Sequence, residues 1–197
     1  MQVRTRWFGY ISCSVLVLLI PGGNRAQTAP STASSGQIEP SRALAGPVRL
    51  AERAVVSLAE AMPEEKYGFA PSARIFTADQ KTEYAGVRTF AEQVAHIASS
   101  NYEYLQAMGI KTDREPSAVL QLKSKSELVQ ALKDSYAAAE NAIATFTTAN
   151  VFEALGEHKT GTRAAYAAAI AWHSMDHYGQ MVEYARMNGI VPPESKK

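Results

Sequence analysis

Four histidines are the residues of this sequence that could perform metal chemistry: His96, His158, His173 and His177. His173 and His177 are four residues apart, so on a helix they lie on one face with their Cβ atoms about 5–6 Å apart. A first-row divalent ion, bound about 2.0–2.1 Å from each imidazole nitrogen, can bridge that separation. The spacing therefore predicts half of a metal site, provided that this segment is helical.

The helix face that carries these two histidines is otherwise apolar or aromatic. Tyr166, Ile170 and Tyr184 follow the same three- and four-residue steps as His173 and His177, so we expect both imidazoles to point into the protein interior. Two buried imidazoles without partners are costly, and a metal ion would satisfy both. The interpretation without a metal is a pair of buried histidines held by hydrogen bonds.

His96 is the expected third ligand, because it lies beside Val94 and Ile97 on the apolar side of another helical segment. Three protein nitrogens leave a coordination position open, which is typical of catalytic metal sites rather than structural ones. The alternative for His96 is a half-exposed position on the polar side of its helix. His158 lies in a polar loop after Gly156 and is expected to be exposed.

The sequence does not identify a catalytic base. Asp176 could orient His173, and Glu92 or Glu103 could act as a base near the metal. For each of these carboxylates, a solvated helix surface is an equally good or better explanation. The sequence also lacks the Glu-x-x-His pair of a di-iron carboxylate site, the HExxH motif and a glycine-rich phosphate loop.

Four segments with helical periodicity must position these histidines, and they begin near residues 47, 89, 124 and 162. Capping boxes open the second segment at Thr89 and the third at Ser124. Gly109 and Gly189 are suited to end the second and fourth. No stretch between residues 47 and 189 alternates as a strand would, so the prediction is an all-α four-helix bundle over residues 47–193, followed by a tail at 194–197.

The long connection over residues 63–88 carries Tyr67, Phe69 and Phe76 and is too apolar for a free loop. We expect it to pack across one end of the bundle.

The first 26 residues have the pattern of a secretory signal peptide: Arg4 and Arg6, an uncharged run from residue 7 to 20, and a break at Pro21. The run is shorter than the roughly 20 residues of a membrane span. We predict cleavage near Ala26, with a retained N-terminal anchor as the alternative. Because of this signal, the chain is expected to be periplasmic or secreted. Residues 27–46 are rich in Ser, Thr, Pro and Gly and are predicted to be a flexible linker.

The charge argues against a nucleic-acid-binding protein, and the cysteine content argues against disulfides and cysteine metal sites. The formal net charge is +1, from 20 basic and 19 acidic residues. The sequence therefore lacks the excess of positive charge that is typical of nucleic-acid-binding proteins. Cys13 is the single cysteine and lies within the predicted signal peptide, which excludes disulfides within the chain and a thiolate metal cluster.

Four stretches resemble the DinB-like family of metal-binding four-helix bundles: residues 62–67, 88–97, 173–180 and 188–193. The resemblance extends from Pro47 to about Pro193. It implies that His96, His173 and His177 are the metal triad and that they bind one divalent ion, such as zinc, nickel or iron. It also implies a site open to water or substrate and, in many relatives, a homodimer.

The family implies two kinds of activity, because some relatives are thiol-dependent S-transferases or isomerases and others are described as hydrolases. The prediction is therefore an exported metal-dependent hydrolase or thiol-dependent transferase acting on an unknown small molecule. The export signal departs from the family pattern and argues against a cytosolic thiol as co-substrate. The alternative function is a non-catalytic exported metal-binding or helical interaction protein.

Overall fold

The structure is a computed structural model that describes residues 36–158 and 160–196. The predicted signal peptide and residues 27–35 of the predicted linker lie outside the described residues.

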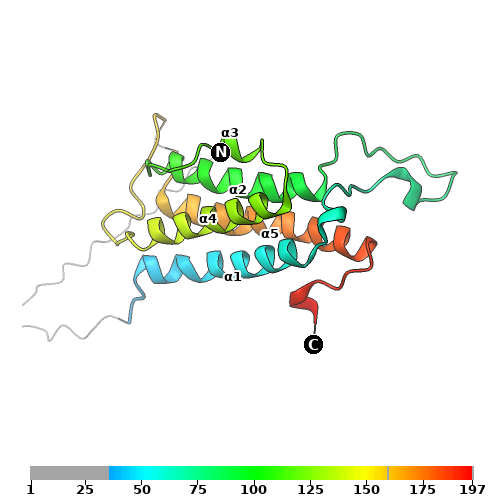
Figure 1. Cartoon of the computed structure of the whole chain (residues 1–197). Helices are drawn as coiled ribbons and strands as arrows, with labels where there is room; N and C mark the ends of the chain where they lie inside the picture. The colour runs from blue at the N-terminus through cyan, green and yellow to red at the C-terminus, as the bar shows by residue number, and fades with distance from the viewer. Residues whose placement is uncertain (1–35, 159, 197) are drawn as a thin grey trace, which may run out of the picture. The chain divides into compact units, whose positions relative to one another are not determined.

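Four long helices form a bundle (Figure 1): α1 (Pro40–Ala61), α2 (Phe90–Ala107), α4 (Lys125–Ile143) and α5 (Arg163–Met187). The connections contain a short helix, α3 (Pro116–Val119), and the 3-10 turns η1 (Glu64–Lys66), η2 (Ala73–Ile75) and η3 (Pro193–Ser195). In the described part of the chain, β pairing is limited to an isolated bridge between Leu155 and Gly161. The predicted all-α four-helix bundle is confirmed.

The core lies between the four long helices, with α1 and α2 each packed against both α4 and α5. Among its fully buried side chains are Leu58 of α1, Phe90 of α2, Tyr136 of α4, and Ile170 and Met181 of α5. Burying a large apolar side chain contributes about 1.5–3 kcal/mol relative to its exposure, so these contacts hold α2 and α5 in a defined register.

The predicted helix caps are present as hydrogen bonds. The backbone N–H of Glu92 donates to Thr89 Oγ1 at 3.2 Å, and the backbone N–H of Thr89 donates to Glu92 Oε2 at 2.7 Å. Ser124 and Glu127 form the same reciprocal pair at the start of α4. After α2 and α5, Gly109 and Gly189 adopt φ values of 77° and 76°, a region that other residues rarely occupy. These local signals set where α2 and α4 begin and where α2 and α5 end.

The predicted start of the first helix is wrong, because α1 begins at Pro40 and not at Pro47. Pro47 lies inside the helix and cannot donate the backbone hydrogen bond expected there. Leu44 and Ala45, in the turn before it, pack against the core and offset that loss. The last part of the predicted flexible linker, residues 40–46, is therefore helical.

The predicted packing of residues 63–88 holds at its two ends, where Phe69 and Val87 pack against the core, but not in its middle. The Tyr67 hydroxyl donates to the carbonyl oxygen of Ala59 at 2.6 Å, and the Tyr67 ring meets Phe90 edge-on at 5.2 Å between ring centroids. Residues 72–86 instead project from the bundle and are largely exposed (Figure 1). Phe76 is exposed there and stacks on Tyr84 at 5.9 Å, so local aromatic pairing replaces contact with the core.

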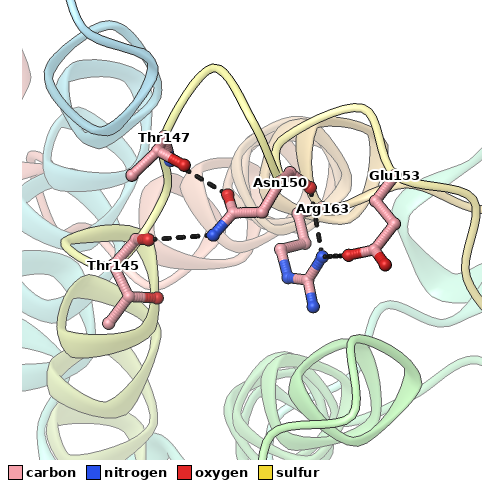
Figure 2. A network of polar contacts seen from close by, with 5 residues as sticks. All are labelled: Thr145, Thr147, Asn150, Glu153 and Arg163. Atoms are coloured by element: carbon pink, nitrogen blue, oxygen red, sulfur yellow. Dashed lines mark hydrogen bonds and ion pairs between the residues drawn. The ribbon is translucent and has the colours of Figure 1, made fainter.

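The connection from α4 to α5 is held by side-chain hydrogen bonds (Figure 2). The Asn150 amide donates to the carbonyl oxygen of Thr145 at 3.2 Å and accepts from the backbone N–H of Thr147 at 2.9 Å. Arg163 Nη1 donates to the carbonyl oxygen of Asn150 at 3.1 Å and to Glu153 Oε2 at 2.7 Å. This network anchors the first residue of α5, the helix that carries His173 and His177.

Among the helices in the described residues, none combines the length and apolar character needed to cross a membrane.

Candidate metal centre

The structure brings the three predicted ligands together from two helices. His96 lies on α2, and His173 and His177 lie one turn apart on α5, which packs against α2. The Nε2 atom of His173 lies 3.2 Å from Nε2 of His96 and 3.1 Å from Nε2 of His177. One nitrogen from each imidazole falls within 4.8 Å of the others. His158 is exposed in the α4–α5 connection, as expected.

Two of the three separations between the donor atoms match those around a tetrahedral cation. Nitrogens that bind such an ion at about 2.0–2.1 Å lie about 3.3 Å from one another, close to the two separations between the histidine Nε2 atoms. The three rings meet edge-on, with centroids 4.6–5.0 Å apart and interplanar angles of 74–88°. Hydrogen bonds among neutral imidazoles cannot satisfy three converging Nε2 atoms at once, whereas one cation can accept a lone pair from each.

The environment keeps the three imidazoles neutral. The pKa of His96 is lowered to about 4, mainly by burial and to a lesser extent by the positive charge of Arg88 and by the other two imidazoles. Burial is also the main cause of the lowered pKa of His173 and of His177. His177 is the most buried of the three, with 6% of its surface exposed. Neutral imidazoles are ready to bind a metal, because no proton has to leave first.

A model of the DinB superfamily matches residues 48–181. The chain belongs to the DinB superfamily. The matched region begins in α1, ends within α5 and contains all three clustered histidines. No curated protein matched the chain. The predicted family is thereby confirmed over most of the bundle.

The carboxylates considered from the sequence are not hydrogen-bonded to the histidines of this DinB-superfamily bundle. Glu92 is held in the capping box with Thr89, and those hydrogen bonds lower the pKa of its carboxyl group. Asp176 is exposed and accepts a hydrogen bond from Gln180 Nε2 at 3.3 Å. His173 Nδ1 is buried without a hydrogen-bond partner, so Asp176 does not orient this ring. Glu103 is exposed on α2.

Sequence reasoning missed a pair of glutamines beside the cluster. Gln93 is 1% exposed on α2, and its Nε2 donates to Gln180 Oε1 on α5 at 2.9 Å. Gln180 Nε2 in turn lies 3.5 Å from His177 Nδ1. The available signal was spacing, because Gln93 precedes His96 by three residues and Gln180 follows His177 by three, which places each on its histidine's face.

Replacing Gln180 with leucine is expected to weaken metal binding about 10- to 100-fold, the usual cost of losing a group that orients a ligand. A histidine that binds a metal through Nε2 carries its proton on Nδ1, and the Gln180 amide is the polar group next to that atom. Rotating the amide presents its oxygen to the Nδ1–H donor. Competition with a chelating dye would measure the affinity.

The matched control is Gln130→Leu, which removes an exposed glutamine on α4 that donates to Asp134 at 2.8 Å. This variant should bind metal as the wild type does. Equal affinities for the Gln180 and Gln130 variants would show that Gln180 does not support His177.

The metal-free protein is expected to lose stability as the pH falls from about 6.5 towards 4. The three histidines have lowered pKa values in the folded state, that of His96 being about 4, so the unfolded chain binds more protons over this interval. Their contribution is therefore present above the unfolded pKa and is lost on acidification. Urea unfolding with a chelator present, at pH 7 and at pH 5, would measure the difference.

The control is a variant with all three histidines replaced by asparagine, in which the pH dependence over this interval should be smaller. The same loss of stability in both proteins would place the titrating groups elsewhere.

Proposed function

We propose that this DinB-superfamily protein is an exported metal-dependent enzyme that holds one divalent cation through His96, His173 and His177. The observation that carries the proposal is the convergence of three Nε2 atoms from α2 and α5, with pKa values that keep the rings neutral. Imidazole ligands suit zinc, nickel, iron and copper, so geometry and supply would select the ion.

Access from solvent supports catalysis over a purely structural site. His96 and His173 are half-buried rather than sealed, and His96 lines a cavity of about 390 Å³. A small molecule in that cavity would contact His96, one of the three clustered histidines. A divalent cation bound there supplies Lewis acidity, which lowers the pKa of a water or thiol that reaches it.

The protein's own residues perform three tasks in this proposal. The buried wall around His177 keeps the donor nitrogens unprotonated, Gln180 orients the His177 ring, and the helix register holds His96 against α5. Hydrolysis and thiol transfer both fit this arrangement, and the substrate is a small molecule.

Export is proposed from the signal-like first 26 residues, with the periplasm or the outside of the cell as the destination. The lack of cysteine after Cys13 suits an oxidising compartment. The homodimer implied by the family resemblance stays a prediction.

A non-catalytic metal-binding protein is the second candidate. The absence of a carboxylate hydrogen-bonded to any of the three imidazoles, among the described residues, favours it. Such a protein would bind the same ion without turnover.

The test begins with metal-free protein reloaded separately with zinc, nickel and iron(II). Hydrolysis of activated esters and transfer of small thiols to an electrophile would then be assayed for the wild type, the His173→Ala/His177→Ala variant and the His158→Ala control. We expect metal-dependent turnover that only the double variant loses. Stoichiometric metal without turnover on either substrate class would favour the second candidate, and unchanged metal content in the double variant would overturn both.

A further inference from the structure

The cavity beside the histidine cluster has a distinct chemical lining. Its polar side chains are Arg88, Glu92 and His96, and apolar surface comes from Val87, Ala95 and Leu120. The volume of about 390 Å³ lies in the range of pockets for small ligands. The cavity is therefore lined both by a candidate metal ligand, His96, and by a positively charged side chain, Arg88.

Arg88 is a cation without a fixed partner. Among the described residues it forms no ion pair within 4.0 Å and no side-chain hydrogen bond. The nearby carboxylate of Glu92 already accepts from the backbone N–H of Thr89 at 2.7 Å and from its hydroxyl at 2.9 Å. The Arg88 backbone is nevertheless held in place, because its carbonyl oxygen accepts from the Tyr184 hydroxyl of α5 at 3.1 Å.

The start of α2 does not itself offer an anion site. The backbone N–H of Thr89 is taken by Glu92, that of Phe90 donates to Phe69 at 2.8 Å, and that of Ala91 donates to Tyr67 at 2.8 Å. An anion in this cavity would therefore be bound by the Arg88 guanidinium and not by the amides of the helix.

We propose that Arg88 binds a carboxylate of the substrate, so that the substrate is a small carboxylic acid whose reacting group meets the histidine cluster. The inference rests on the proposed function. A guanidinium matches a carboxylate with two parallel hydrogen bonds. The lining also contains the Glu92 carboxylate, which would repel a dianion such as phosphate more strongly than a singly charged group.

The shared cavity lining supports this placement. Arg88 and His96 line the same cavity, and Arg88 directly precedes Thr89, the N-cap of the helix that carries His96. A carboxylate bound to Arg88 would lie in the same cavity as His96.

The experiment uses the full chain loaded with cobalt(II), whose visible spectrum reports ligands that reach the ion. The probes are 3-mercaptopropionate and the neutral thiol 2-mercaptoethanol, titrated separately and checked by calorimetry. We expect the wild type to bind 3-mercaptopropionate more tightly. Arg88→Met should lose about 10-fold or more of that preference, since hydrogen bonds between charged groups are the strong ones.

Arg74→Met is the matched control, because Arg74 is an exposed arginine in the projecting segment and lies outside the cavity lining. It should keep the wild-type preference, and thermal melts should show both variants folded. Elemental analysis should give the same metal content in Arg88→Met as in the wild type, which separates this inference from the proposed metal site.

Two results would overturn the inference while leaving the metal site intact. One is a wild-type protein that binds both thiols equally, and the other is an Arg88→Met variant that keeps the preference for 3-mercaptopropionate. Inorganic phosphate that competes with 3-mercaptopropionate more strongly than acetate does would contradict the carboxylate assignment. Failure to load any metal would instead defeat the proposed function.

Discussion

Replacing His177 with alanine is expected to remove stoichiometric metal from the purified protein. His177 is the most buried histidine of the cluster, and its Nε2 lies 3.1 Å from Nε2 of His173. Losing a group that only orients a ligand costs about 10- to 100-fold in affinity, so losing the ligand itself should cost more than about 100-fold. His96 and His173 alone would bind the ion too weakly to retain it through dialysis.

Elemental analysis after dialysis and a competition titration would measure this effect. His158→Ala is the matched control, because His158 is an exposed histidine in the α4–α5 connection and stands apart from the cluster. Metal content that is equal in the His177 and His158 variants would exclude His177 from the site.

Metal loading is expected to raise the melting temperature by about 5–11 °C when the free ion is at 100 times its dissociation constant. Binding to the folded state alone contributes about 2.7 kcal/mol under that condition. The physical cause is that the three nitrogens converge only when α2 and α5 are packed together, so the unfolded chain lacks the site. Thermal melts with zinc, and again after addition of a chelator, would measure the shift.

A variant with alanine at both His96 and His177 serves as the reference, and its melting temperature should not respond to zinc. A comparable rise in that variant would mean that zinc stabilises the bundle through other groups. No rise in the wild type would mean that the cluster does not bind zinc in the folded state.

Local signals in the sequence predicted much of the bundle. Thr89 with Glu92, and Ser124 with Glu127, were recognisable because the partners in a capping box are three residues apart. Gly109 and Gly189 marked helix ends for an equally local reason, since their backbone conformation favours glycine.

Two predictions were wrong, the start of the first helix and the packing of the 63–88 connection, because contacts between residues outside the local pattern decided the structure there. The Ser-, Pro- and Gly-rich stretch before Pro47 suggested a linker, yet Leu44 packs on the core and the helix extends back to Pro40. The aromatic residues of the 63–88 connection suggested packing, yet Phe76 pairs with Tyr84 away from the bundle. Neither outcome follows from periodicity within the segment.

The sequence by itself determined four helices, their caps and the shared face of His173 and His177, because each depends on residues within about one helical turn. The apolar neighbours Val94 and Ile97 indicated His96 as the third ligand, and the family resemblance implied the same triad. Only the tertiary structure decided that the Nε2 atoms converge, that Gln180 lies beside His177, and that Arg88 faces the same cavity as His96. These arrangements depend on the register of α2 against α5, which is set by core packing between residues far apart in the chain.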